Sequence, residues 1–329
     1  MPPPLRKDTY QVRRAVLLLT AMVAAVLLAT GVGLAQPAST DPTFITEWGS
    51  YGREDGQFRQ PLGVASDASG NIYVADRKNQ RIQKFDPRGE YITKWGIFGD
   101  EDGDFLYPIE VAADTSGNVY VVDQKSPRVQ KFDSEGNFVT AWGDSGSEDG
   151  RFNLDYRFHK GPAGIATDAS ENVYVVDQGN SRIQKFDSEG NFIAKWGSYG
   201  DGDGQFRNPQ GIATDSAENV YIADTDNNRI QKFDSEGNFV TKWGSYGRGG
   251  GQFYYPEGLA TDRSGNVYVA DTYNNRIQKF DSEGNPKTKW GSYGSEDGEF
   301  RYPHGAAVGP SGTIYVADTY NNRIQRFGR

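Results

Sequence analysis

The sequence predicts an all-β fold: a six-bladed β-propeller built from four-stranded antiparallel blades. A unit reading Y-V-A-D, four variable residues and R-I-Q-K-F recurs six times, with a spacing of 47 residues that lengthens once, to 54. The six tryptophans recur with the same spacing. Short apolar runs separated by Gly, Asn and Asp at a period in the forties are typical of propeller blades.

The fourth unit shows the elements of one blade. The expected strands are 211–214, 220–223, 229–233 and 239–243, in order from the channel to the rim. The continuous apolar run of the second strand predicts burial on both faces, because a blade lies between two neighbouring blades. Turn residues separate all four strands. No segment after residue 35 has helical periodicity.

The ring is expected to close through its two chain ends. The sixth unit stops at Arg329 and lacks an outer strand, whereas Phe44–Trp48 matches the outer strand Phe239–Trp243. The N-terminal strand should therefore complete the sixth blade, so that no inner strand edge stays unpaired. The predicted propeller spans residues 43–329, preceded by a linker over 36–42.

Residues 1–35 are expected to lie outside the fold. Four basic residues precede Ala15–Leu34, a run of twenty uncharged residues, and Gly33-Leu34-Ala35 resembles a cleavage site. This layout is typical of a signal peptide, but the run is also long enough to span a bilayer as an uncleaved anchor. In both cases we expect the protein to be exported, either secreted or anchored and facing outside the cytoplasm.

Composition excludes several classes of function. The absence of cysteine removes disulfides, thiolate metal sites and thiol nucleophiles. A net charge of −9 disfavours binding to nucleic acid. The body after residue 35 is more acidic still, because the N-terminal segment carries four basic residues and one acidic residue. We expect a monomer, with contact to a membrane only through an uncleaved N-terminal segment.

The units, each preceded by P-x-G-[IVL]-A-x-D, resemble NHL repeats over roughly residues 43–329. The resemblance implies a six-bladed propeller, in agreement with the count of units. NHL-type proteins have diverse functions: some bind RNA on a basic face, some are extracellular sensor domains, and one related propeller is a metal-dependent lyase. Animal relatives join the repeats to RING ubiquitin ligases. This chain has no cysteines for a RING, no kinase motif and no basic surface, so the resemblance implies only an extracytoplasmic binding role.

The charged residues that recur in every unit are interpreted as parts of the blade. The Asp and Arg that flank each four-residue turn, such as Asp224 and Arg229, should face each other as a cross-strand ion pair. The loops between blades repeat S-x-G-x-x-D-G-x-F, whose acidic residues leave calcium open as a cofactor. These loops are interpreted as solvated turns, and no other cofactor is expected. The loop aspartates are Asp55, Asp102, Asp149, Asp203 and Asp297.

Interruptions of the repeat are the better candidates for a site, since one ligand needs an asymmetric environment. Glu110 stands where the other inner strands have glycine, and a seven-residue insertion before Pro162 contains His159. His159 and His304, the two histidines, both come near the start of an inner strand, so they should lie near one mouth of the channel. Their blades are opposite each other in a ring of six, so joint coordination of one metal ion is not expected.

Tyrosines gather in the loops of blades five and six. Loops at equivalent positions should share one face of the propeller, and exposed tyrosine is a frequent anchor for peptides and sugars. The alternative is that these rings only cover the junctions between blades. The candidate ligand-binding residues are Tyr254, Tyr255, Tyr273, Tyr302, His304 and Tyr320, with Glu110 and His159 as channel-mouth residues.

These observations predict a non-catalytic, extracytoplasmic propeller that binds a protein, peptide or glycan. No catalytic residue is assigned, because no nucleophile motif occurs after residue 35. The alternatives are a metal-dependent lyase or hydrolase with its site at the channel mouth, and a wall or matrix protein without a discrete ligand.

Overall fold

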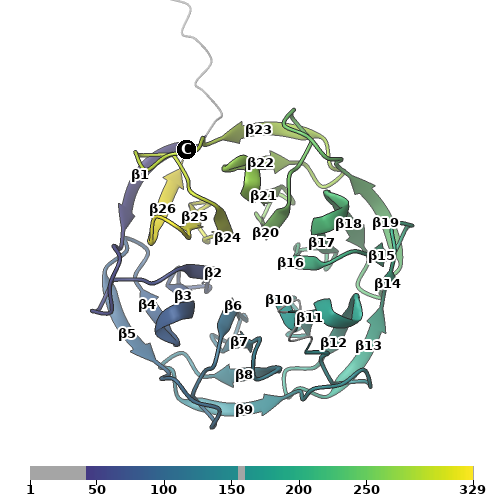
Figure 1. The fold of residues 1–329 in the computed structure, drawn as a ribbon, viewed down its shortest axis with the longest axis horizontal. Coiled ribbons are helices and arrows are strands. Elements are labelled where there is room, and N and C mark those ends of the chain that lie inside the picture. Colours follow the sequence, from purple (N-terminus) through teal and green to yellow (C-terminus); the bar gives the residue numbers. More distant parts are fainter. Residues whose placement is uncertain (1–41, 155–159, 329) are drawn as a thin grey trace, which may run out of the picture. The chain divides into compact units, whose positions relative to one another are not determined.

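The computed structural model describes residues 42–154 and 160–328, and residues 41–329 form one compact unit. Six four-stranded antiparallel sheets stand around a central channel, one sheet for each repeat (Figure 1). The predicted fold class is confirmed. The sixth sheet has the order β1-β26-β25-β24, so the N-terminal strand does complete the last blade.

The strands occupy the same four positions in each blade. The inner strands are β2 (Pro61–Ser66), β6 (Pro108–Ala113), β10 (Pro162–Thr167), β16 (Pro209–Thr214), β20 (Pro256–Thr261) and β24 (Pro303–Val308). The second strands are β3 (Ile72–Asp76), β7 (Val119–Asp123), β11 (Val173–Asp177), β17 (Val220–Asp224), β21 (Val267–Asp271) and β25 (Ile314–Asp318).

The third strands are β4 (Arg81–Phe85), β8 (Arg128–Phe132), β12 (Arg182–Phe186), β18 (Arg229–Phe233), β22 (Arg276–Phe280) and β26 (Arg323–Gly328). The outer strands are β5 (Tyr91–Trp95), β9 (Phe138–Trp142), β13 (Phe192–Trp196), β19 (Phe239–Trp243), β23 (Pro286–Trp290) and, for blade six, β1 (Thr43–Trp48).

In four of the six blades the turn between the second and third strands carries a short 3₁₀ helix, which the sequence periodicity did not indicate. These helices are η1 (Arg77–Asn79), η2 (Gln178–Asn180), η3 (Thr225–Asn227) and η4 (Thr272–Asn274). The inter-blade loop before blade four also forms a small parallel pair, β14 (Ser198–Tyr199) with β15 (Gln205–Phe206). These turns and loops lie on one face of the propeller, which is also where each inner strand begins.

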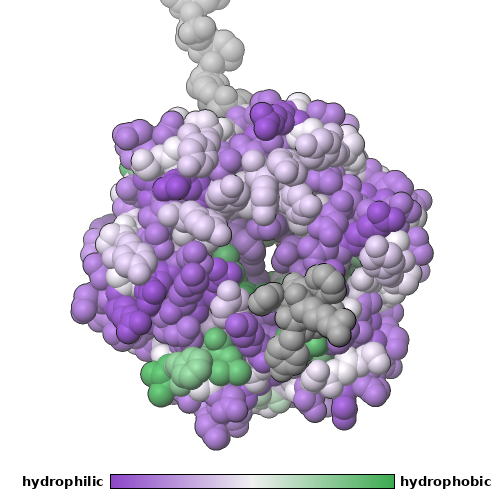
Figure 2. Space-filling model, in the orientation of Figure 1, coloured by the Kyte–Doolittle hydropathy of each residue, from purple (hydrophilic) through white to green (hydrophobic). Residues whose placement is uncertain are grey.

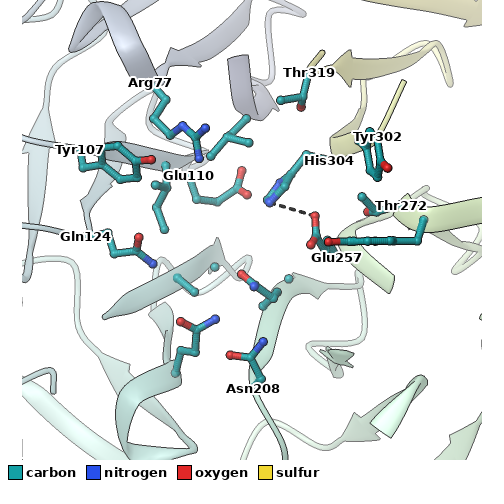
Figure 3. Close-up of a pocket in the computed structure, with 18 of the residues that line it drawn as sticks. Arg77, Tyr107, Glu110, Gln124, Asn208, Glu257, Thr272, Tyr302, His304 and Thr319 are labelled. Atoms are coloured by element: carbon teal, nitrogen blue, oxygen red, sulfur yellow. Dashed lines mark ion pairs between the residues drawn. The ribbon is translucent and has the colours of Figure 1, made fainter. Parts of the chain in front are cut away.

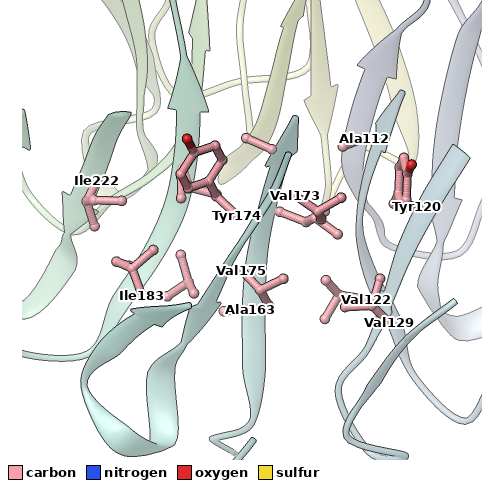
Figure 4. Close-up of a cluster of buried hydrophobic side chains, with 14 of the residues drawn as sticks. Ala112, Tyr120, Val122, Val129, Ala163, Val173, Tyr174, Val175, Ile183 and Ile222 are labelled. Atoms are coloured by element: carbon pink, nitrogen blue, oxygen red, sulfur yellow. The ribbon is translucent and has the colours of Figure 1, made fainter. Parts of the chain in front are cut away.

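The core lies between the blades. Successive residues of β11 point to opposite faces of its sheet, so Val173 packs toward blade two and Tyr174 toward blade four (Figure 4). A second contact repeats at the rim, where the tryptophan of each outer strand meets a phenylalanine of the next blade. Trp48 lies 5.7 Å from Phe85 between ring centroids, so the N-terminal strand also packs blade six against blade one.

Candidate functional site at the channel mouth

The channel opens into a hollow of about 560 Å³ on the face that carries the turns. Figure 3 shows side chains from several blades pointing into this hollow, and Figure 2 shows the opening among mostly hydrophilic residues. Farther along the channel, hollows of about 160 and 290 Å³ are lined by the inner strands and by the turns of the opposite face. The hollow at the mouth has the largest volume of these three.

One sequence position of each inner strand, the x of P-x-G, supplies much of the lining. The six residues at this position are Leu62, Ile109, Ala163, Gln210, Glu257 and His304. Blades one to three therefore present apolar side chains, whereas blades four to six present polar ones. The following glycine permits close approach of the next inner strand: a Cβ at Gly211 would lie 1.9 Å from the backbone oxygen of Glu257.

Glu257 and His304 contact each other across blades five and six. Glu257 Oε2 lies 3.2 Å from His304 Nε2 (Figure 3). Burial raises the pKa of the Glu257 carboxyl to about 7 and lowers the pKa of the His304 imidazole to about 3. Burial thus favours the neutral form of both groups, in which the carboxyl O–H can donate to Nε2. His304 Nδ1 is buried without a hydrogen-bond partner among the described residues.

Glu110 faces the same hollow from blade two (Figure 3). Its strand keeps the register of the other inner strands but has one more pair: Glu110 pairs with Val122, whereas in the other five blades the bulge that follows the proline leaves this position unpaired. The backbone N–H of Val111 donates to the carboxylate at 3.4 Å. Burial raises the pKa of Glu110 to about 8. Glu110 is therefore largely protonated at neutral pH.

Arg77 brings the positive charge of the mouth from η1. Its guanidinium donates a hydrogen bond to the side chain of Gln60 and lies 4.9 Å from the ring centroid of Tyr107. Burial lowers the pKa of Arg77. The corresponding residues of blades four to six are threonines, whose hydroxyls donate to inter-blade carbonyls at 2.8 Å, as Thr272 does to Pro303. The mouth is consequently asymmetric at this position as well.

The tyrosines predicted from the sequence come together as one continuous strip. Neighbouring ring centroids along it are 4.9–5.4 Å apart. We call this set the tyrosine strip, and it consists of Tyr246, Tyr254, Tyr255, Tyr273, Tyr302 and Tyr320. Tyr273, Tyr302 and Tyr320 line the hollow, whereas Tyr246 lies at the outer end and is 67 % exposed.

The recurring charged residues have structural contacts. In five blades the Arg of the turn donates to the facing Asp, with Nε–Oδ2 distances of 2.7–2.8 Å. Blade two is an exception to the expected pairing, because the Lys125-Ser126-Pro127 turn leaves Asp123 bonded to the backbone N–H groups of Leu106 and Tyr107. Arg128 lies instead 3.6 Å from Asp102.

Four of the five loop aspartates, Asp55, Asp102, Asp149 and Asp203, lie against basic side chains; Asp203, for example, lies 2.5 Å from Lys242. Within residues 42–154 and 160–328, no three Asp, Glu, His or Cys side chains are grouped closely enough to hold a metal ion. No helix in the same ranges is long and apolar enough to cross a membrane. His159 and the segment 1–41, with its expected leader and most of its linker, lie outside the described residues.

Sequence reasoning placed Glu110 and His304 at a channel mouth and the tyrosines on one face of the propeller. In the structure Glu110, His304 and three of these tyrosines line one hollow. Sequence reasoning missed Glu257 and Arg77. A signal for Glu257 was present, since the x of P-x-G changes from apolar to polar halfway around the ring. Arg77 could have been found in the same way, because the residue after the turn Asp is threonine only in blades four to six.

The fold and the site define a ring-closed β-propeller with one irregular, polar channel mouth. The NHL repeat model matches residues 58–85, 160–186, 206–233, 253–280 and 300–327. The chain is an NHL-repeat β-propeller, as its resemblance to that family predicted. The matches do not include blade two, which is the blade with Glu110 and the altered turn.

Curated relatives match only one repeat. The B-box type zinc finger protein ncl-1 of Caenorhabditis elegans is 47 % identical over 45 residues, which is 14 % of this chain and 5 % of that protein. Protein brain tumor of Drosophila melanogaster is also 47 % identical over 45 residues, 14 % of this chain and 4 % of that protein. The chain thus spans about a twentieth of the length of these relatives.

Solved structures share the fold at low identity. An auxiliary nutrient binding protein from Bacteroides thetaiotaomicron has a TM-score of 0.62 at 12 % identity, over 90 % of this chain and 74 % of that one. A streptogramin B lyase has a TM-score of 0.59 at 14 % identity, over 86 % of this chain and 97 % of that one. A gluconolactonase from Xanthomonas campestris has a TM-score of 0.59 at 13 % identity, over 90 % of this chain and 98 % of that one.

Proposed function

We propose that this chain is an exported, non-catalytic binding propeller that takes a protein, peptide or glycan at its channel mouth. The observation that carries the proposal is the continuity of the tyrosine strip with the hollow: six neighbouring rings lead from an exposed end at Tyr246 to the lining residue Tyr320. Tyrosine gives a large contact area with little loss of side-chain freedom and retains a polar hydroxyl group.

The proposed site is asymmetric, as recognition of a single ligand requires. Its polar groups come from blades four to six at the P-x-G position and from blades one to three at the turn position. Hydrophobic and aromatic walls with a few convergent polar groups are typical of ligand pockets. The export proposal is supported by the basic and apolar layout of residues 1–35.

Binding of the full chain to peptide and glycan arrays, in buffer with and without a chelator, tests the proposal. We expect capture that survives chelation and falls at least tenfold in the Tyr273→Ala/Tyr320→Ala double variant. A Tyr199→Ala variant is the control, because Tyr199 is 70 % exposed in the corresponding loop one blade before Tyr246 and lies outside the strip. Equal capture by the double variant would show that the strip is not the binding surface.

A second candidate is a metal-dependent lyase or hydrolase with its centre at the mouth. The contact between Glu257 and His304 favours it, because it offers two ligand side chains; any third ligand would have to come from outside this pair. This candidate predicts a tightly bound metal ion in a one-to-one ratio that is lost on His304→Ala substitution. Elemental analysis of the purified chain and of that variant decides between the two functions.

A further inference from the structure

The mouth presents two kinds of hydrogen-bonding group to the same ligand. The carboxyl groups of Glu110 and Glu257 can accept hydrogen bonds when ionised, and the Arg77 guanidinium can only donate. Figure 3 shows Arg77 and Glu110 on one side of the hollow, with Glu257 and His304 across from them. A ligand that fits this arrangement has a strong donor next to an acceptor.

The acidic side chains of the hollow favour a cationic donor that lets them ionise. Glu110 and Glu257, once ionised, outnumber the Arg77 guanidinium, which already contacts Gln60 and the ring of Tyr107. Tyrosine faces add attraction for a cation, because their ring faces are electron-rich. The net charge of −9 for the chain acts in the same direction. A primary ammonium group would stabilise the ionised form of both carboxyl groups, which burial alone disfavours.

The tyrosine strip favours an extended peptide as the carrier of the ammonium group. From Tyr320 through Tyr302, Tyr273 and Tyr254 to Tyr246, four steps of about 5 Å give a path of roughly 20 Å. An extended peptide rises about 3.3 Å per residue, so about six residues would cover this path. The first carbonyl oxygen of a peptide belongs to the same residue as its α-ammonium group, as the neighbouring donor and acceptor positions of the hollow require.

We propose that the channel mouth binds the free N-terminus of an extended peptide, which deepens the proposed function and rests on it. The α-ammonium group donates to the carboxylates of Glu257 and Glu110, and the first carbonyl oxygen accepts from Arg77. The next residues lie across the tyrosine strip toward the rim. This mode belongs to the general class in which a chain end is captured in a polar recess.

The test uses random hexapeptides with a C-terminal fluorophore, in one pool with free and in one with acetylated N-termini. We expect the full chain to bind its selected peptides at least tenfold more tightly when the N-terminus is free. A Glu257→Gln variant should lose most of this discrimination, whereas Tyr199→Ala should retain it. The ratio of the affinities for peptides with free and with acetylated N-termini is measured for each variant separately. A thermal melt shows that the variant is folded.

The pH profile gives a second, independent readout. The ionisable groups of the mouth are Arg77, Glu110, Glu257 and His304, together with the hydroxyls of Tyr107 and the strip. Burial holds the carboxyl pKa values at about 8 and 7, so binding of an ammonium group releases protons. Affinity for the free-amine pool should rise from pH 5.5 to 7.5, and then fall as the peptide amine, with a pKa near 8, loses its proton.

The possible results distinguish a failure of N-terminal recognition from a failure of the proposed binding function. Equal binding of free and acetylated peptides would overturn N-terminal recognition and leave peptide binding intact. Capture of glycans but of neither peptide pool would overturn the peptide class alone. If neither peptides nor glycans are captured, the inference and the proposed function both fail.

Discussion

The two ends of the channel are built from the same six repeats but differ in how their polar groups are satisfied. At the far end, an aspartate of five blades accepts hydrogen bonds from a tyrosine hydroxyl at 2.8–3.0 Å and from a neighbouring asparagine. These aspartates are Asp67, Asp114, Asp168, Asp215 and Asp262. Blade six has Gly309 there, and its Tyr315 donates to the backbone of Pro87.

At the mouth, the side chains at the P-x-G position that face the hollow differ from blade to blade. Burial raises the pKa values of Glu110 and Glu257 and lowers the pKa of His304, so it favours the neutral form of each group. His304 Nδ1 has no hydrogen-bond partner among the described residues. The difference indicates that the far end serves the construction of the blades, whereas the mouth keeps groups that are only partly satisfied and can serve a ligand.

The largest loss of folding stability is expected from a substitution at the far end of the channel. Replacing Asp215 by alanine leaves the hydroxyl of Tyr221 and the side chain of Asn219 without their buried acceptor. The free energy of unfolding should fall by about 2–4 kcal/mol. Urea denaturation measures it, with Asp203→Ala at the exposed Lys242 pair as a control that changes little. If both variants lost the same free energy of unfolding, the buried Asp215 network would contribute no more to stability than the exposed ion pair of Asp203 with Lys242.

A smaller change, a gain in folding stability that depends on pH, is expected from a substitution at the mouth. The folded chain holds the Glu110 proton up to about pH 8, whereas the unfolded chain releases it near pH 4.3, so this residue lowers stability as pH rises between these values. Glutamine cannot ionise. Glu110→Gln should therefore exceed the original chain by a margin that grows from pH 5 to pH 9, where it reaches about 1–3 kcal/mol.

Thermal melts across this pH range measure the gain. Glu283→Gln, in an exposed hairpin, is the control without a pH-dependent difference. A gain at pH 5 as large as that at pH 9 would mean that ionisation of Glu110 is not its cause.

The smallest expected effect on stability belongs to the tyrosine strip. Tyr273 and Tyr320 are 45 % and 52 % exposed, so their joint replacement by alanine should lower the free energy of unfolding by no more than about 1 kcal/mol. The same denaturation experiment measures it. A loss comparable to that of Asp215→Ala would make the strip a structural cover for the blade junctions instead of a binding surface.

Much of the fold could be predicted because each repeat makes the same local choices. The apolar run of the second strand, the turn aspartate and the rim tryptophan recur in phase, and repetition averages out the ambiguity of any single copy. The site was only partly predictable. Glu110 is conspicuous because it breaks an otherwise constant glycine, whereas Glu257 occupies a position that varies in all six blades.

The sequence by itself determined the number of blades, their strands, the closure of the ring by Phe44–Trp48 and the face that carries the tyrosines. Those properties come from periodicity, which is local and repeated. Only the tertiary structure decided that Glu257 meets His304, that Arg77 shares their hollow and that the tyrosines form one strip. These contacts join different blades, and their burial and pKa shifts depend on side chains brought together only when the ring is closed.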